Sequence, residues 1–451
     1  MKKLNYLLFA LSTLFVFSSC RDKDDPEPIV HAPETIPNNI TTNMTLTSDR
    51  TWVLYGETHV KSGAVLTIQP GTVIKSDITQ KGSLVIDKGA RIEAVGTATQ
   101  PIVFTSGRPA GNRLPGDWGG LVIIGRAPTN RTSVGPVEGG VAGEYGLDNI
   151  PNDNSGTLKY VRVEYAGVSV AQGSEVNAIS FYAVGSGTTL DHVQVSYAKD
   201  DAFEFFGGTV NGKHLISYGT SDDDFDFDNG YTGKLQFGIV LRRPELADPN
   251  DQGNGIEADN ESTVPATGPS QPNTRFVMSN FTILGSNGAA GEHERQWYAM
   301  RLRRAVQFSI TNSVIAGFKE GGMVLESSHT ATAYNNGTSV FRNNVITALK
   351  QTYFAGDAAA TGILSSAALQ TKAEADGNAT LANAAALNLV APFNLTAPNF
   401  RPQTGSPALQ GTWVAPDNSG FFTQVNYRGA VSANDTWLDN WTNFNPGNTT
   451  Y

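Results

Sequence analysis

Two runs of sequence that lie 22 residues apart decide the fold. The first is Asp200-Asp201-Ala202-Phe203-Glu204-Phe205-Phe206-Gly207-Gly208, and the second is Asp222-Asp223-Asp224-Phe225-Asp226-Phe227-Asp228-Asn229-Gly230. In both runs Phe alternates with an acidic residue, which is the period-two pattern of a β-strand with one apolar face. A coil of this length holds about three short strands and as many turns, and parallel stacking of such coils places the Phe rings inside. The acidic side chains between them, led by Glu204 and Asp226, then point outward.

Shorter repeats extend the same pattern along the chain. Leu66-Thr67-Ile68-Gln69-Pro70-Gly71 returns eighteen residues later as Leu84-Val85-Ile86-Asp87-Lys88-Gly89, and later coils begin with Asn280, Asn312 and Asn343. An Asn at a repeated position predicts an internal ladder of side-chain amides. With 47 Gly, 22 Pro and 16% charged residues, the chain is predicted to be all-β. The expected fold is a right-handed single-stranded parallel β-helix with long loop excursions and a small helical insertion.

We expect four parts along the chain. Residues 1–19 form a lipoprotein signal peptide, and residues 20–45 form a flexible tether rich in acidic residues and Pro. The β-helix spans residues 46–410, with an Ala-rich, helical insertion at about 355–392. Residues 411–451, which we call the C-terminal segment, are expected to form a cap or tail that folds back over the edge of the final coil.

Composition and missing motifs exclude several classes of function. The formal net charge is −10, whereas binding along a nucleic-acid backbone needs a basic surface, so no nucleic-acid partner is expected. A single Cys allows neither an internal disulfide nor a Cys-based zinc site. The sequence has no G-x-S-x-G, G-K-[ST] or H-E-x-x-H motif. After the N-terminal leader, no apolar run is long enough for a membrane-spanning helix, which argues against a channel or transporter.

The N-terminus predicts export and lipidation. Lys2 and Lys3 precede an apolar stretch from Leu7 to Phe17, which is too short to span a bilayer and is therefore a signal peptide and not an anchor. Cys20 follows after two Ser residues, at the place where a lipoprotein leader is cut. We expect Cys20 to be lipidated and to attach the protein to a membrane.

Four segments carry a resemblance to a known family. They are Asp117-Trp118-Gly119-Gly120-Leu121-Val122-Ile123-Ile124-Gly125-Arg126, the repeat from Asp200 to Gly230, Gly405-Ser406-Pro407-Ala408-Leu409 and Tyr427-Arg428-Gly429-Ala430. Through them the chain resembles right-handed parallel β-helix lipoproteins of Bacteroidota and, more loosely, pectate-lyase-like solenoids. The run from Asp22 to Glu27 is similar to the acidic surface-export signal of such lipoproteins. The resemblance implies an outer-membrane lipoprotein that is lipid-anchored and faces the cell exterior, but it implies no particular activity.

Continuing the register of the two acidic runs gives two columns of outward side chains, which we call the acidic ladder. The first column is Ser180, Glu204, Asp226, Glu257 and Arg301, and the second is Tyr182, Phe206, Asp228, Asp259 and Arg303. Neighbouring rungs of a sheet lie about 4.8 Å apart, so like charges in one column raise one another's pKa. Such a ladder needs a compensating partner, and three hypotheses compete to explain it.

The first hypothesis is a Ca²⁺ site, because Ca²⁺ takes about six to eight oxygen ligands. The predicted ligands are Asp224, Asp226, Asp228, Glu257 and Asp259. Their spacing does not match an EF-hand loop, which needs Gly at its sixth position and Glu at its twelfth. The chain has Asn229 and Leu235 at those positions.

The second hypothesis is a polysaccharide site. Tyr182, Trp297 and Tyr298 are predicted to stack on sugar rings, and Arg303 is predicted to pair with an acidic sugar. A catalytic version of the site would be a polysaccharide lyase or a glycoside hydrolase. Its candidate catalytic residues are Glu204, Asp226, Glu257, Arg301 and His293.

The third hypothesis is that the acidic residues simply solvate an exposed sheet. We favour a surface-exposed outer-membrane lipoprotein that binds an extracellular ligand, a polysaccharide, on the β-helix face, with Ca²⁺ as the candidate cofactor. One alternative is the lyase or hydrolase, although no complete catalytic constellation is visible and an enzyme is therefore disfavoured. The other is an adhesion or outer-membrane-complex accessory protein with an outer-membrane protein as partner. His192 and His214 recur at one position of the coil, which predicts stacked structural residues.

Overall fold

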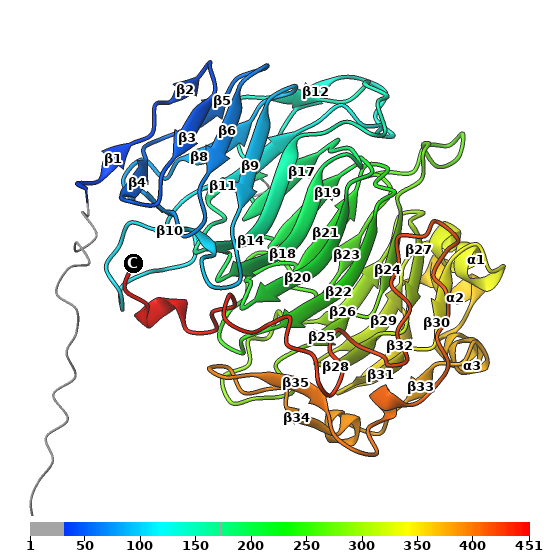
Figure 1. Ribbon diagram of the computed structural model, residues 1–451. Helices are drawn as coiled ribbons and strands as arrows, with labels where there is room; N and C mark the ends of the chain where they lie inside the picture. Colours follow the sequence, from blue (N-terminus) through cyan, green and yellow to red (C-terminus); the bar gives the residue numbers. More distant parts are fainter. Residues whose placement is uncertain (1–30, 172–173) are drawn as a thin grey trace, which may run out of the picture.

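The computed structural model describes residues 31–171 and 174–451. The predicted signal peptide, Cys20 and the run Asp22 to Glu27 lie outside these residues. The described chain winds into a solenoid that begins with the blue strands β1 and β2 and ends near three short helices, α1 to α3 (Figure 1). Within the described residues, no helix combines the length and apolar character needed to cross a bilayer.

One side of the solenoid is a sheet of 11 strands, all paired in parallel, which we call the straight sheet. Its strands in spatial order are β2 (Asn39–Ile40), β5 (Thr58–Val60), β8 (Ser83–Ile86), β11 (Gly120–Ile124), β17 (Ile179–Tyr182), β19 (Phe203–Phe206), β21 (Phe225–Asp228), β23 (Glu257–Ala258), β26 (Tyr298–Leu302), β29 (Gly321–Leu325) and β32 (Gln351–Ala355). Every rung therefore contributes one strand to this side.

The other sides are formed by a second parallel sheet of 18 strands, which we call the bent sheet. Its strands are β1 (Glu34–Thr35), β3 (Met44–Leu46), β4 (Thr51–Leu54), β6 (Val65–Ile68), β7 (Val73–Ser76), β9 (Arg91–Val95), β10 (Ile102–Ser106), β14 (Gly156–Glu164), β18 (Thr189–Ser196), β20 (Asn211–Tyr218), β22 (Lys234–Leu241), β24 (Arg275–Ser279), β25 (Thr282–Leu284), β27 (Gln307–Thr311), β28 (Val314–Phe318), β30 (Val340–Arg342), β31 (Val345–Ala348) and β33 (Ala379–Thr380). The expected parallel β-helix is confirmed.

In each central coil, one residue in the left-handed backbone conformation bends the chain within the bent sheet. We call these residues the corner column: Tyr160, His192, His214, Phe237, Asn280, Asn312 and Asn343, which all have positive φ. In β14 the bend separates a half that pairs with β9 from a half that pairs with β10. The bend gives each coil its third side, as the 22-residue repeat requires.

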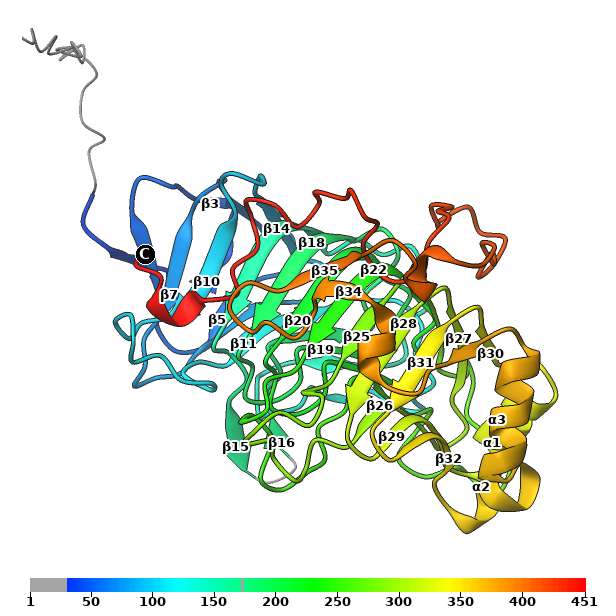
Figure 2. The same cartoon turned by 90° about the horizontal axis from the view of Figure 1, so that it is seen from below.

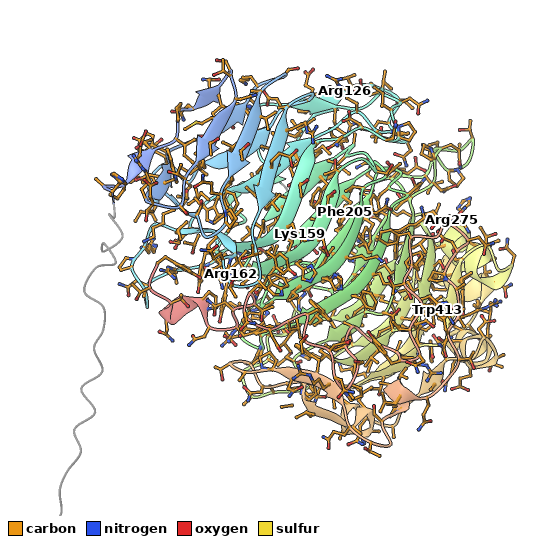
Figure 3. The ribbon with its side chains drawn as sticks, in the orientation of Figure 1. Arg126, Lys159, Arg162, Phe205, Arg275 and Trp413 are labelled. Atoms are coloured by element: carbon orange, nitrogen blue, oxygen red, sulfur yellow. The ribbon has the colours of Figure 1, made fainter. Side chains whose placement is uncertain are left out.

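The Phe repeats form the core as the sequence predicts. Phe203 stacks on Phe225 with ring centroids 5.0 Å apart, and Phe205 stacks on Phe227 at 5.4 Å. All four rings are fully buried, and Phe205 lies within the coil in Figure 3. Each such side chain contributes about 1.5 to 3 kcal/mol of burial free energy, so these stacks fix the register of the rungs.

The predicted hydrogen bonding of Asn amides along the stack is confirmed between Asn343 and Asn312, but the prediction that Asn280, Asn312 and Asn343 form an internal ladder is wrong. These residues lie outside the coil, because the left-handed bend turns their side chains towards the C-terminal segment. The Asn343 amide donates to Asn312 Oδ1 (2.7 Å) and to the carbonyl of Thr412 (3.0 Å). The internal amide pair is Asn344 and Asn378, which bond at 2.9 Å.

The end of the solenoid is covered by the Ala-rich insertion and not by the C-terminal segment. α1 (Ser328–Asn335), α2 (Ala358–Ile363) and α3 (Ser366–Ala375) lie at this end, where α2 and α3 pack against β32. The hairpin of β34 (Leu389–Ala391) and β35 (Asn399–Pro402) then packs on the bent sheet.

The C-terminal segment runs back along the outer side of the bent sheet towards the first rungs. The side-chain amides of Gln236 and Gln194 donate to the carbonyls of Thr423 (2.7 Å) and Asn443 (2.8 Å). The chain ends beside β7 and β10 (Figure 2), where Lys75 Nζ donates to the carbonyl of Tyr451 (2.8 Å). It differs from the expected end cap because side-chain amides of the outward corner column, those of Asn280, Asn312 and Asn343, donate to its backbone carbonyls and hold it along the side.

Candidate functional site

The structure confirms the predicted register of the acidic ladder. Ser180, Glu204, Asp226, Glu257 and Arg301 are successive partners on β17, β19, β21, β23 and β26. In the second column Tyr182, Phe206 and Asp228 are partners. Backbone hydrogen bonds from Asp259 to Phe227 and from Arg303 to Ala258 continue that column beyond the ends of the strands.

The acidic ladder is covered by loops. Glu204 is 7% exposed, Glu257 8% and Asp259 6%. These values overturn the hypothesis that the acidic residues simply solvate an open sheet.

Part of the cover is the hairpin of β12 (Gly135–Pro136) and β13 (Glu144–Tyr145). Its residues Val137, Val141 and Tyr145 pack in one cluster with Tyr182 and Phe206 on the outer side of the straight sheet. Tyr182 stacks on Phe206 at 4.3 Å and lies 4.8 Å from Tyr145. Tyr182 is only 2% exposed, so this predicted sugar-binding ring is covered by protein. The hairpin also brings Glu138 towards Glu204, and burial followed by the charge of Glu138 raises the pKa of Glu204 well above its usual range.

Carboxylate oxygens converge in three overlapping groups along the ladder. The groups are Asp200, Asp201 and Asp222; Asp201, Glu204 and Asp226; and Asp223, Asp226 and Glu257, each with its oxygens within 4.8 Å of one another. Carboxylate oxygens at such separations are the donor set that hard divalent cations take. Asp226 belongs to two of the groups and is the centre of the arrangement.

Burial and mutual repulsion raise the pKa values of these carboxyl groups. Burial, followed by the charges of Glu257 and Asp228, raises the pKa of Asp226 well above its usual range. Burial and neighbouring charges raise the pKa values of Asp228 and Glu257 to about 7. One oxygen each of Asp222 and Asp226 is buried without a hydrogen-bond partner among the described residues. The cluster therefore requires protons or a cation.

Arginines neutralise only the far end of the ladder. Arg301 lies 3.3 Å from Glu257 and 3.2 Å from Glu326. Arg303 pairs with Asp259 at 2.9 Å and also contacts Glu257, and Arg304 pairs with Asp259 at 2.6 Å. The carboxylates that converge on the preceding rungs have no Arg or Lys partner among the ion pairs of the described residues; they are Asp200, Asp201, Glu204, Asp222, Asp223 and Asp226.

Asp224, one of the predicted metal ligands, points the other way. It is fully buried and pairs with Arg242 at 2.9 Å. The same guanidinium donates to the carbonyls of Asp222 (2.8 Å) and Asn254 (2.7 Å). Asp224 and Arg242 thus hold the turns that present Asp223 and its neighbours, and Asp224 does not join the carboxylate groups of the ladder.

An open cleft lies beyond the arginine end of the ladder. Its volume is about 630 Å³, and it is lined by Gln252, Glu294, Arg295, Trp297, Tyr298, Lys319, Glu320 and Lys350. Trp297 is half-buried, and its ring packs edge-on against Tyr298 with centroids 5.5 Å apart. His293 lies on the same loop, where its Nδ1 accepts from the backbone of Arg295 (3.2 Å). The cleft combines an aromatic wall with charges of both signs.

The solenoid of stacked parallel strands agrees with a comparison to known protein families. The family model described as a pectate-lyase-like β-helix domain matches residues 38–396. The chain belongs to this family. No curated protein and no solved structure matches it.

Sequence reasoning missed several residues of this pectate-lyase-like β-helix site. Asp201 and Asp223 carry a signal that could have found them, because they occupy equivalent positions of the 22-residue repeat. Arg242 and Glu138 carry none, since they come from segments without periodicity. Three predicted residues, Glu204, Asp226 and Glu257, are brought together as expected.

Proposed function

We propose that this pectate-lyase-like β-helix protein binds an extracellular polysaccharide in the cleft beside Trp297 and Tyr298. The observation that carries the proposal is the aromatic wall of an open cleft whose rim holds Arg295, Lys319 and Lys350. Aromatic faces pack on the apolar faces of sugar rings, and a few placed polar groups fix orientation. Membership of a pectate-lyase-like family agrees with a polysaccharide-related role.

The second part of the proposal is that Ca²⁺ occupies the acidic ladder. Asp226 and Glu257 come from the predicted ligand set. The predicted ligands Asp224, Asp228 and Asp259 are not among the converging oxygens, whereas Asp201, Glu204 and Asp223 are. Buried carboxylates at this spacing are stable only if their charge is compensated. A hard cation does so without protonating them, and it fastens the covering loops to the sheet.

The third part concerns location. We propose that the mature protein is lipidated at Cys20, attached to the outer membrane and displayed on the cell exterior. The support is the leader, the position of Cys20 and the acidic run from Asp22 to Glu27.

Glycan binding is tested by array screening followed by isothermal titration. Trp297→Ala should lose about five- to thirtyfold in affinity, as removal of a stacking ring costs roughly 1 to 2 kcal/mol. Trp413→Ala is the matched control, because Trp413 lies on the C-terminal segment over the bent sheet (Figure 3) and should bind as wild type. Absence of saccharide binding with and without calcium contradicts the proposal. Release of unsaturated or new reducing ends would instead support the lyase or hydrolase.

Calcium binding is tested by titration of chelator-treated protein. Asp226→Asn should abolish or greatly weaken binding, because Asp226 belongs to two groups of converging carboxylates. Glu93→Gln, which changes a carboxylate paired with Arg91 on the bent sheet, should leave binding unchanged. Equal heats for wild type and Asp226→Asn would remove the cation from the proposal.

Anchoring is tested with Cys20→Ala in cells. The variant should accumulate as unprocessed or soluble protein without lipid label, whereas the wild type should be labelled and accessible to protease on intact cells. A labelled, membrane-bound variant would contradict lipidation at Cys20. Protease resistance of the wild type on intact cells would contradict surface display.

A further inference from the structure

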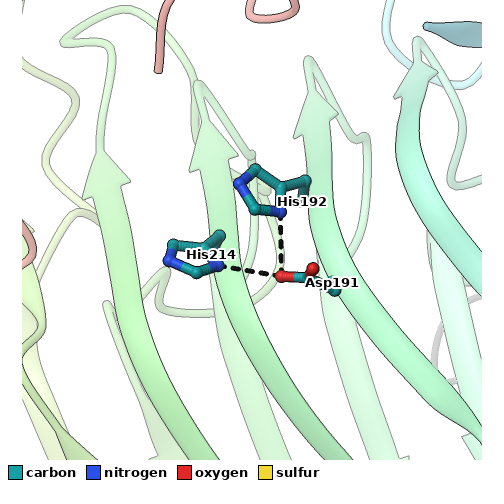
Figure 4. A group of neighbouring side chains, drawn as sticks. All are labelled: Asp191, His192 and His214. Atoms are coloured by element: carbon teal, nitrogen blue, oxygen red, sulfur yellow. Dashed lines mark hydrogen bonds and ion pairs between the residues drawn. The ribbon is translucent and has the colours of Figure 1, made fainter. Parts of the chain in front are cut away.

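A second group of converging ligand atoms lies on the bent sheet, away from the acidic ladder. Asp191 and His192 are neighbours on β18, and His214 lies on β20 beside them (Figure 4). The Nδ1 atoms of both histidines are 2.8 Å from the same oxygen, Asp191 Oδ1. All three ligand atoms lie within 4.8 Å of one another.

Stacking explains why aromatic rings occupy these positions, but it does not explain why the Nδ1 atoms of His192 and His214 both face Asp191. Tyr160, His192, His214 and Phe237 form one continuous stack, with successive centroids 4.4, 4.2 and 5.2 Å apart. Tyr and Phe at the two ends serve the stack equally well, so stacking alone does not require imidazole. Both imidazoles nevertheless turn the same nitrogen towards one carboxylate.

The hydrogen bonding of this group is incomplete. His214 Nδ1 is hydrogen-bonded to Asp191 Oδ1, but the ring of His192 is not aligned for such a bond. Its Nδ1 is buried and has no hydrogen-bond partner among the described residues. His192 is only 8% exposed, and its Nδ1 faces Asp191 Oδ1 at 2.8 Å without the alignment of a hydrogen bond, so the burial of this nitrogen is only partly compensated. A cation between the three ligand atoms would bind the lone pair of His192 Nδ1.

We propose that Asp191, His192 and His214 bind a divalent transition-metal ion of the Zn²⁺ type. Two imidazole nitrogens and one carboxylate oxygen are the donor set that Zn²⁺, Co²⁺ and Ni²⁺ prefer over Ca²⁺. Zinc bonds to such ligands measure about 2.0 to 2.1 Å, so two ligands of a tetrahedral ion lie about 3.3 Å apart. The two 2.8 Å separations therefore need to open by only about 0.5 Å, which small side-chain rotations supply.

The surroundings of the group allow an ion to enter and hold the ligands in place. The side chains of Asp191 and His214 are 25% and 21% exposed, which leaves a path from solvent and room for a water ligand. Trp437 and Trp441 of the C-terminal segment pack on the His192 ring at 6.1 and 5.6 Å. Lys159 Nζ lies 3.7 Å from the other Asp191 oxygen and orients the carboxylate. The ion would link β18 and β20 beneath the C-terminal segment.

The decisive variant is His214→Phe, because Phe already fills the next position of the stack. It should fold and melt like wild type in chelator. Its Zn²⁺ affinity should fall more than about a hundredfold, beyond the 10- to 100-fold effect of changing an outer-shell partner. Cobalt is the reporter: wild type titrated with Co²⁺ should develop the visible absorption of tetrahedral nitrogen-ligated cobalt, and His214→Phe should not.

Asp226→Asn separates this group from the acidic ladder, since it should keep the Co²⁺ absorption in full. Asp191→Asn should weaken Zn²⁺ binding without disturbing the stack. The proposal is overturned if wild type shows no Co²⁺ absorption and no melting shift with Zn²⁺. It is equally overturned if His214→Phe responds to both metals as wild type does.

Discussion

The straight sheet and the corner column both bury polar groups beneath other parts of the chain, but they compensate them differently. At Asn343 the amide donates to Asn312 and Thr412, and its oxygen accepts from Arg428 at 2.6 Å. On the straight sheet, Asp226 faces other carboxylates, and one of its oxygens has no partner among the described residues. At Asn343 the corner column is complete with protein groups alone. At Asp226 the acidic ladder is complete only with protons or a cation.

The largest loss of unfolding free energy is expected at the buried pair of Asp224 and Arg242, which holds the turns next to the acidic ladder. Arg242→Ala leaves Asp224 buried without its partner, which should cost about 3 to 5 kcal/mol of unfolding free energy. Arg91→Ala removes a pair whose Arg side chain is 44% exposed, and should cost less than about 1 kcal/mol. Urea unfolding of both variants checks this, and similar losses would contradict the contrast between a buried and a surface arginine.

A second effect is the response of the ladder to pH and calcium. The raised pKa values mean that the folded protein keeps protons that the unfolded chain releases. Without a cation, the unfolding free energy should be highest below about pH 4 and fall as the pH rises to the pKa of about 7 of Asp228 and Glu257. At neutral pH, Ca²⁺ at a hundredfold excess over Kd should restore about 2.7 kcal/mol.

Urea unfolding across this pH range, in chelator and in calcium, measures both effects. Asp226→Asn should flatten the pH dependence in chelator, because it removes one buried ionisable group at the centre of the cluster. The same variant should lose the calcium response. A stability that rises from pH 4 to pH 7 in chelator would contradict the assignment of protons to the ladder.

The smallest effect is expected at the corner. Asn343→Ala removes hydrogen bonds to uncharged partners and two that Arg428 donates, at a cost of about 1 to 2 kcal/mol. Since no titrating carboxylate is involved, this loss should be the same at pH 5 and pH 8 and with or without calcium. Thermal melts under the four conditions check it, and a calcium-dependent loss would show that the two sides are coupled.

The sequence predicts the register of the ladder because Phe and acidic residues alternate strictly. A slip of one residue between Phe205 and Phe227 would turn every charge into the core, so only one alignment is stable. The loops that cover the acidic ladder have no such alternation in their sequence. The β12–β13 hairpin and Glu138 reach the sheet through a few apolar contacts made by irregular backbone, and the partner of Asp224 lies 18 residues further on, at Arg242. Periodicity determines neighbours within the stack, whereas contacts from loops depend on the folded shape.

The path of the C-terminal segment has a mechanical consequence. In a simple solenoid each rung touches only the next, so the ends fray and unfolding can proceed rung by rung. Here one strap joins the outside of late rungs, at Asn312 and Asn343, to early ones at Gln194 and Lys75. A rung at either end cannot peel away without releasing the strap from the others. The strap thus adds contacts between rungs that are not neighbours. The solenoid should therefore unfold in one cooperative step and not rung by rung from its ends.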